Sequence, residues 1–257
     1  MLLDDKIAVV HGAAGAVGGA VARAFAREGA RVVLAGRTLT KLDRVAGEIR
    51  AAGGVADTAR VDALDREAVD ALVEETVARL GRIDVSFNAV TYGDIQGTPL
   101  VDLPSERLTR PTADAVAAQH LTTRAAARAM VGQGSGVILT VVGHGPPTPN
   151  IGSTMISWDV VQSMLRQFAA ELGPKGVRVA WLRTAGFIES ILEAPDYGSS
   201  FTPLAGQELL KELEARTMLQ RLPSLAEAGD LAAFLASDLA RSITATGVNL
   251  TAGAVAD

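Results

Sequence analysis

Cysteine is absent from the chain, and histidine occurs only three times. The lack of cysteine excludes disulfides, thiolate catalysis, iron–sulfur clusters and cysteine-ligated zinc. His11, His120 and His144 are too scattered along the chain to suggest a histidine metal site. We therefore expect no bound metal.

Long apolar runs and basic runs are also missing. No stretch approaches the roughly 18 apolar residues of a membrane-spanning helix. The N-terminal residues place acids ahead of a short apolar run, which is not typical of a signal peptide. The net charge is −5 and no basic cluster stands out, which argues against a nucleic-acid surface. We expect a cytoplasmic protein whose partner is a small-molecule ligand or substrate, with neither a membrane nor a nucleic acid as partner.

The 257 residues are enough for one large domain, residues 1–257, and 48% of them are hydrophobic. Short apolar runs typical of strands alternate with longer alanine-rich runs of helical periodicity. This alternation predicts a single-domain α/β Rossmann fold, a doubly wound parallel sheet of about seven strands with helices on both faces. Strands are predicted at 6–10, 31–35, 55–61, 83–87, 136–142, 177–182 and 247–251. Helices are predicted at 17–28, 39–51, 65–80, 113–130, 154–172 and 225–237. Residues 91–111 are predicted to be irregular, and residues 186–223 to form an inserted substrate lid.

A glycine-rich turn follows the first predicted strand and leads into the first predicted helix. Its glycines have the spacing G-x-x-G-x-x-G. Glycine lets the backbone turn tightly and approach a pyrophosphate, to which the helix N-terminus offers free N–H groups. We predict that Gly12, Ala14, Gly15, Val17 and Gly18 bind a dinucleotide. The alternative is a tight strand–helix turn without a ligand.

The residue type after the second predicted strand indicates which dinucleotide would bind. Such folds place either an acid there, for the ribose 2′-OH of NAD, or an Arg near the 2′-phosphate of NADP. This sequence has Arg37 and no acid, which favours NADP(H). The alternative is a solvated surface arginine.

Further motifs occur along the whole chain. Residues 171–179 (ELGPKGVRV) are close to ELGPxGVRV, and residues 87–90 (FNAV) are similar to NNAG with the first and last residues changed. The glycine turn resembles TGxxxGxG, with His11 in place of Thr and Ala16 in place of the middle Gly. Residues 221–247 resemble RxxxPxExAxxxxFLxSDxAxxxTG. On these motifs the chain resembles the classical short-chain dehydrogenase/reductase family from end to end.

The resemblance implies NADP(H) binding in an extended groove at the carboxyl ends of the strands. It assigns Asp62 to the adenine ring and places Asn88, Ala89 and Gly186 in cofactor-binding segments. It also implies a homodimer or homotetramer built through the long helices and the last strand.

In that family a Ser, a Tyr and a Lys carry out the chemistry, and an Asn holds a water. Counting back from residues 170–174 puts the Tyr position at Thr154 and the Lys position at Trp158. The Ser position falls on Gly143 and the Asn position near Ala115. All four positions have therefore lost the family's side chains, and an indole offers one N–H donor but no charge.

The absence of Tyr and Lys does not depend on this alignment. No tyrosine lies between residues 92 and 197, and no lysine between residues 41 and 175. We expect Trp158 to fill the space of the missing Lys and to stack near the nicotinamide ribose.

Three residues are candidate substitutes for the missing chemistry. His144 could donate a proton near neutral pH, or it is a loop histidine packed against nearby prolines. Tyr92 could point into the same cleft, or it forms an aromatic wall of the pocket. Thr154 keeps a hydroxyl at the Tyr position, although an alkyl hydroxyl is a far weaker acid than a phenol.

Other polar residues have structural or lid roles in this interpretation. His11 is expected to make a structural hydrogen bond, and His120 to be interfacial or core. Glu189, Glu193 and Tyr197 belong to the expected lid, where loops often carry specificity. The alternative for these three is plain surface.

Three functions remain open at this point. The first is a divergent NADP(H)-dependent oxidoreductase with non-standard or lost carbonyl–alcohol chemistry. The second is a non-catalytic NADP(H)-binding sensor or assembly partner. The third is a non-redox enzyme, such as a lyase, isomerase or cyclase, on the same scaffold.

Overall fold

The computed structural model describes residues 1–93, 96–193, 202 and 204–256. Within these residues seven strands form one parallel sheet in the order β3-β2-β1-β4-β5-β6-β7. The strands are β1 (Ile7–His11), β2 (Arg31–Gly36), β3 (Val55–Arg60), β4 (Val85–Asn88), β5 (Gly136–Gly143), β6 (Val177–Thr184) and β7 (Thr246–Asn249). The predicted doubly wound α/β fold is confirmed.

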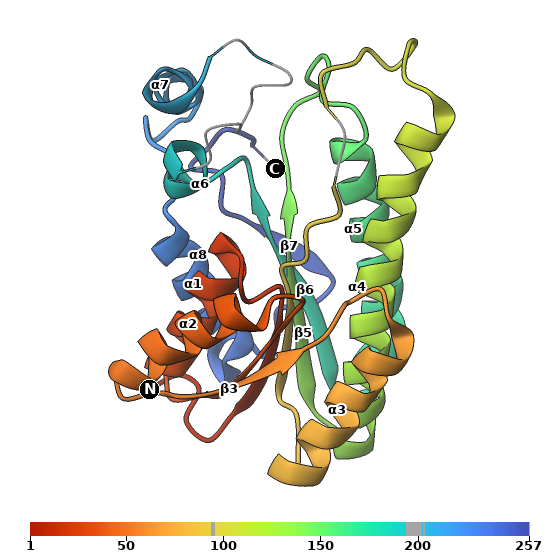
Figure 1. The fold of residues 1–257 in the computed structure, drawn as a ribbon, viewed down its shortest axis with the longest axis vertical. Coiled ribbons are helices and arrows are strands. Elements are labelled where there is room, and N and C mark those ends of the chain that lie inside the picture. The colour runs from red at the N-terminus through yellow and green to blue at the C-terminus, as the bar shows by residue number, and fades with distance from the viewer. Residues whose placement is uncertain (94–95, 194–201, 203, 257) are drawn as a thin grey trace.

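Helices cover both faces of this sheet, as Figure 1 shows. The described helices are α1 (Ala16–Arg27), α2 (Leu39–Ala51), α3 (Arg66–Leu80), α4 (Ser105–Gln133), α5 (Thr154–Leu172), α6 (Ile188–Glu193), α7 (Gly206–Ala215) and α8 (Leu225–Ala236). None of them is long and apolar enough to cross a bilayer.

Each face of the sheet has its own apolar core. The core beneath α1, α2 and α8 is centred on the T-shaped contact of Phe25 with Phe87, whose ring centroids are 6.2 Å apart. The core beneath α3, α4 and α5 contains Trp181, whose indole Nε1 donates to the Gln162 side chain at 3.0 Å. Alternate residues of β1, β2, β5 and β6 face the two cores, which explains why these strands are mostly apolar.

The main difference from the predicted elements is the start of α4. The helix begins at Ser105 and not near residue 113, and it contains the buried Pro111. A proline inside a helix removes one hydrogen bond and normally indicates a break. Here the packing of α4 against the sheet and α5 outweighs that cost, so part of the stretch predicted as irregular is helical. The end of α4 lies three residues later than predicted, and the other strand and helix boundaries agree to within two residues.

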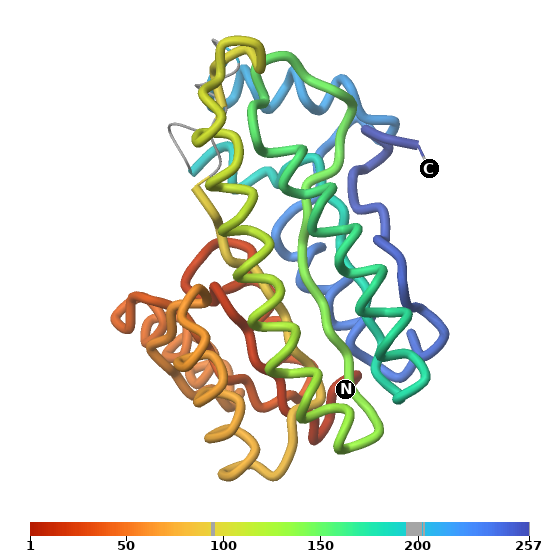
Figure 2. Tube along the Cα trace, turned by 90° about the vertical axis from the view of Figure 1, so that its right-hand side faces the viewer, coloured from red at the N-terminus to blue at the C-terminus, as the bar shows by residue number. Residues whose placement is uncertain are grey.

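The carboxyl ends of the strands point to the same end of the molecule. Figures 1 and 2 both place α6, α7 and the start of α4 at that end. The region predicted as a lid contains α6 and α7, but residues 194–201 and 203 lie outside the described part of the chain. Its role as a lid therefore stays a prediction.

Asn88 at the end of β4 connects three elements. Its side-chain amide donates to the Thr122 hydroxyl of α4 at 2.8 Å, and its amide oxygen accepts the Val90 N–H at 2.8 Å. Its carbonyl accepts the Thr140 hydroxyl of β5 at 2.7 Å. These bonds fix where the chain leaves the sheet toward α4.

We expect Asn88→Ala to lower stability, because the Val90 N–H and the Thr122 hydroxyl both lose this partner. The loss of such bonds costs about 1–3 kcal/mol, which corresponds to a fall in Tm of roughly 2–12 °C for a domain of this size. Thermal unfolding followed by circular dichroism measures it. Gln167→Ala, at an exposed position of α5, is the control and should stay near the wild-type Tm. Equal Tm values for the two variants would contradict the connecting role of Asn88.

Candidate cofactor and active site

The turn between β1 and α1 is packed closely against the end of β4. The Gly12 N–H donates to the Ala35 carbonyl of β2 at 2.9 Å, and Gly12 has φ +75°. A Cβ at Gly12 would lie 2.5 Å from the Ala89 carbonyl oxygen, and a Cβ at Gly18 would collide with the Gly12 carbonyl. Glycine is therefore required at both positions.

The first backbone N–H groups of α1 lie next to this turn. Its N-cap residue, Gly15, makes no side-chain cap, and the first helical bond runs from the Gly19 N–H to the Gly15 carbonyl at 2.8 Å. The N–H groups of residues 16–18 precede that bond and point out of the helix end. Gly15 is exposed, whereas Ala14 and Val17 are half-buried against the core. The arrangement fits an anionic diphosphate.

Two charged residues lie at neighbouring strand ends on the side of β2 and β3. Arg37 directly follows β2, is exposed, and forms no ion pair with the described residues. Asp62 follows β3, is also exposed, and its carboxylate accepts the Leu64 N–H at 3.0 Å. Both are therefore accessible at the carboxyl edge of the sheet.

Ala89 and Gly186 lie on the segments that leave β4 and β6. The Ala89 N–H donates to the His11 carbonyl at 2.9 Å, which ties the end of β4 to the end of β1. The Gly186 N–H donates to the Thr184 hydroxyl at 3.1 Å. Because the Asn88 side chain is already engaged inside the protein, a cofactor would meet the backbone of this segment.

His11 is buried at the end of β1, between Ala35 of β2 and Asn88 of β4. Its Nε2 atom has no hydrogen-bond partner in the described structure, so the structural bond predicted for it is not found at this atom. Burial lowers the pKa of His11 to about 4, because the interior disfavours the charged imidazolium. The side chain is thus neutral at physiological pH.

The positions matched to the family's chemical residues lie on β5, α4 and α5. Gly143 ends β5, and the indole of Trp158 packs against it so closely that a Cβ at Gly143 would collide with the six-membered ring. Thr154 is buried, and its hydroxyl accepts the Gln96 side-chain amide at 3.1 Å. Ala115 is buried within α4.

The candidate substitutes are only partly brought together. The His144 N–H donates to the Thr184 carbonyl at 2.7 Å, and its Nε2 lies 3.4 Å from the Arg183 Nη1. Tyr92 is half-buried and packs against the core beneath α3, α4 and α5, which also includes Trp158. This contact suits the interpretation of Tyr92 as an aromatic wall.

Two residues of this region were not predicted from the sequence. Gln96 lies in the stretch predicted to be irregular, where no pattern marks it. Arg183 is a charged residue near the end of an apolar strand, and that position is a signal that could have been used.

The lid residues have different surroundings. The Glu189 carboxylate accepts the Leu225 N–H at 2.9 Å and so caps the start of α8, whereas Glu193 is exposed. Tyr197 lies outside the described residues. No group of three or more acidic or histidine side chains in the described part of the chain could hold a metal ion.

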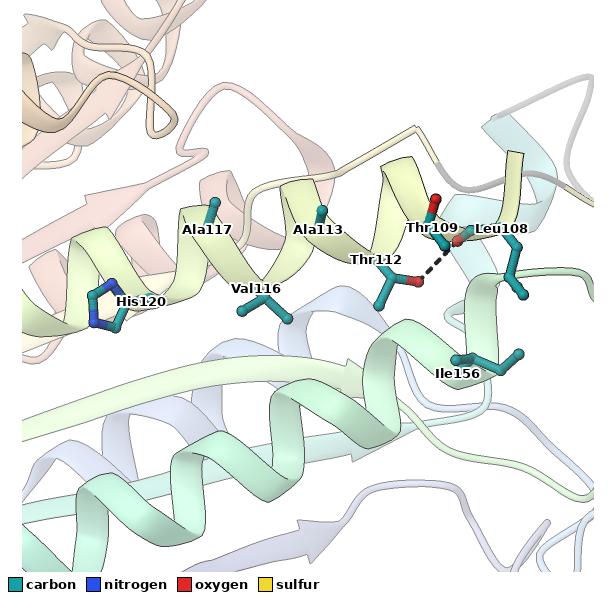
Figure 3. Close-up of a pocket in the computed structure, with 8 residues that line it drawn as sticks. All are labelled: Leu108, Thr109, Thr112, Ala113, Val116, Ala117, His120 and Ile156. Atoms are coloured by element: carbon teal, nitrogen blue, oxygen red, sulfur yellow. Dashed lines mark hydrogen bonds between the residues drawn. The ribbon is translucent and has the colours of Figure 1, made fainter. Parts of the chain in front are cut away.

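An apolar groove lies between α4 and α5. It measures about 550 Å³, and Figure 3 shows Val116, His120 and Ile156 on its sides. His120 is exposed, with its ring 5.9 Å from that of Phe168, so it does not belong to the core. The two long helices are those on which the expected subunit contact falls, and the oligomeric state stays a prediction.

The amino-acid sequence is similar to those of known oxidoreductases. A family model described as enoyl-(acyl carrier protein) reductase matches residues 12–254. The chain is 33% identical to L-rhamnose 1-dehydrogenase (NAD(P)(+)) of Azotobacter vinelandii, over 95% of this chain and 94% of that protein. It is 27% identical to 7alpha-hydroxysteroid dehydrogenase of Escherichia coli, over 98% of this chain and 95% of that protein.

Solved structures of related proteins have the same fold over nearly the whole chain. A 7alpha-hydroxysteroid dehydrogenase complexed with NADH and 7-oxoglycochenodeoxycholic acid has a TM-score of 0.86 and 25% identity, over 99% of this chain and 96% of that one. A structure from Beutenbergia cavernae with bound NADP at low occupancy has a TM-score of 0.83 and 28% identity, over 99% and 98%.

The seven-stranded parallel sheet with helices on both faces defines a Rossmann-type α/β fold. With the matches above, the chain belongs to the short-chain dehydrogenase/reductase family of oxidoreductases.

His11 should make the stability of the protein depend on pH between about 4 and 6.5. The unfolded chain binds a proton there with the ordinary pKa of 6.5, whereas the folded chain does so only near 4. Stability is therefore lost as the pH falls through this window, by up to about 3 kcal/mol from this group. In His11→Thr, Tm should fall less between pH 7 and pH 4.5 than it does in the wild type. His120→Thr, at an exposed histidine, should keep the wild-type difference; a similar loss in both variants would contradict the assignment to His11.

Proposed function

We propose that the protein binds NADP(H) at the carboxyl ends of β1, β2 and β4. The close-packed glycine turn and the uncapped N-terminus of α1 support a diphosphate site. Solved relatives hold NADH or NADP, so family membership does not choose between them. Arg37 favours the 2′-phosphate, because it is exposed at the end of β2 without an acidic partner among the described residues.

The chain's own residues would bind the cofactor by distinct contacts. The N–H groups of residues 16–18 would receive the diphosphate, Arg37 the 2′-phosphate, and Asp62 would lie beside the adenine ring. Ala89 and Gly186 would offer backbone to the other half of the molecule. A nicotinamide cofactor supplies or accepts a hydride when it is bound.

We also propose that the family's ordinary carbonyl–alcohol chemistry is replaced or lost in this chain. The observation that carries this proposal is the packing of Trp158 on Gly143. It leaves an indole where the family would have a hydroxyl and an ammonium group. Thr154, at the position matched to the acid, is buried and already accepts a bond from Gln96. General acid–base assistance is typically worth ~10²–10⁴ in rate.

A divergent oxidoreductase on a small-molecule substrate is the function that the whole-chain likeness supports best. Its proton would come from the substrate or from His144, which lies at the end of β5 beside Arg183. The second candidate is an NADP(H)-binding sensor or partner protein. It is favoured because a site that fits the cofactor lies next to an indole where the family has its acid–base groups. Measured turnover would distinguish the oxidoreductase from the sensor.

The choice of cofactor can be measured by calorimetric titration. We expect wild-type protein to bind NADPH more tightly than NADH. In Arg37→Ala, NADPH affinity should fall about tenfold or more, because a charge-assisted hydrogen bond contributes ~1.5–3 kcal/mol, while NADH affinity changes little. Arg44→Ala, at an exposed position on α2, is the control. Equal affinities for NADPH and NADH in the wild type would refute the role of Arg37.

Hydride transfer can be measured with NADPH deuterated at nicotinamide C4 and a panel of ketones and aldehydes. We expect turnover at least about 10²-fold below that of a relative with the family's Ser, Tyr and Lys. Slow label transfer to one substrate class would support a divergent oxidoreductase. Binding of NADPH without any transfer would favour the sensor, and rates equal to the relative's would refute the proposed change of chemistry.

A further inference from the structure

Gly143 is required by space and not by backbone conformation. Its φ lies outside the left-handed region that favours glycine, so its backbone would accept any residue. The obstacle is Trp158, because a Cβ at Gly143 would meet three ring carbons of the indole, Cε3, Cζ3 and Cη2. Gly145, two residues later, has open space around its Cβ position. The indole and any side chain at position 143 thus exclude each other.

The indole of Trp158 is partly packed against the protein and partly accessible. Trp158 is half-buried and packs against the core beneath α3, α4 and α5. It lies one helical turn after the buried Thr154 and one turn before Gln162, whose side chain is bonded to Trp181 at 3.0 Å. These neighbours fix the face of α5 that meets the sheet, and part of the Trp158 side chain remains accessible.

The position of Trp158 along the sheet indicates which part of a ligand it meets. In a doubly wound sheet the dinucleotide crosses the edge at the point where the strand order reverses, here between β1 and β4. Arg37 and Asp62 lie on the β2 and β3 side of that point. β5 lies on the other side, so a dinucleotide whose adenine half lies over β2 and β3 directs its nicotinamide half toward β5.

We propose that Gly143 and Trp158 form one coupled unit that makes the indole the wall of the ligand site beside the nicotinamide ring. The ligand part of this proposal rests on the proposed binding of NADP(H); the coupling part does not. The unit offers a flat aromatic face for stacking at the end of β5, in place of a hydroxyl or an ammonium group. The unit therefore favours a flat ring next to β5 and supplies no acid of its own, so a proton would have to come from the substrate or from His144.

The coupling is tested by thermal unfolding of a double-mutant cycle without any ligand. Gly143→Ser should lower Tm by roughly 2–12 °C in the wild-type background, because extra volume in a packed site is destabilising. In the Trp158→Ala background the same substitution should change Tm little, since the ring is gone. Gly145→Ser is the matched control and should be tolerated in both backgrounds.

Two results of this cycle would overturn the coupling. One is a Gly143→Ser variant as stable as the wild type. The other is an equal loss of Tm in the wild-type and Trp158→Ala backgrounds. If Trp158→Ala itself fails to fold, Trp158→Leu provides the second background, because it removes the ring and keeps an apolar side chain.

The ligand part is tested by tryptophan fluorescence with two probes, NADP⁺ and 2′-phospho-ADP-ribose, which lacks the nicotinamide. NADP⁺ should quench the emission of the wild type, and 2′-phospho-ADP-ribose should not. In Trp158→Phe the quenching should be lost while calorimetry still shows NADP⁺ binding. The remaining tryptophan, Trp181, is buried beneath α5.

The failures of the two proposals are distinguishable. Quenching that persists in Trp158→Phe, or equal quenching by both probes, overturns the placement of the indole although NADP⁺ binds. No binding of NADP⁺ by calorimetry refutes the proposed function and with it the ligand part. The unfolding cycle decides the coupling in either case.

Discussion

The parallel direction of all seven strands is the constraint on which the rest of the structure depends. Parallel strands need crossover helices, and these helices bury both faces of the sheet. Polar groups that must meet a ligand are therefore confined to the edge where the carboxyl ends lie together. Gly12, Arg37, Asn88 and Gly143 come from distant parts of the sequence, and they follow or end four of these strands.

At that edge, close backbone packing matters as much as side-chain chemistry. The turn after β1 touches Ala89, and Asn88 uses its amide and its carbonyl to hold α4 and β5. Neither contact requires a ligand. The half of the site proposed for the diphosphate is thus formed by the same packing that stabilises the fold.

The sequence predicts what is local and periodic. The helices at 39–51 and 154–172 match α2 and α5, because their apolar spacing and end signals lie within the segments themselves. The start of α4 could not be predicted, since Pro111 favours a break and only tertiary packing overrides it. In the site, the glycine turn could be predicted, because its glycines lie within one short segment and meet a positive φ at Gly12 and a close backbone contact at Gly18. The contact between Gly143 and Trp158 could not be predicted, because it joins a strand end to a helix across a loop and depends on the volume of one ring.

Mutual exclusion at positions 143 and 158 also limits the order in which such a chain can change by single substitutions. A chain with a side chain at 143 has no room for the indole, so glycine must come first and tryptophan second. The reverse substitutions are ordered in the same way, because Trp158 must be replaced by a smaller residue before Gly143 can be replaced by serine. Two positions that block each other in this way can exchange their residues by single substitutions in one order only.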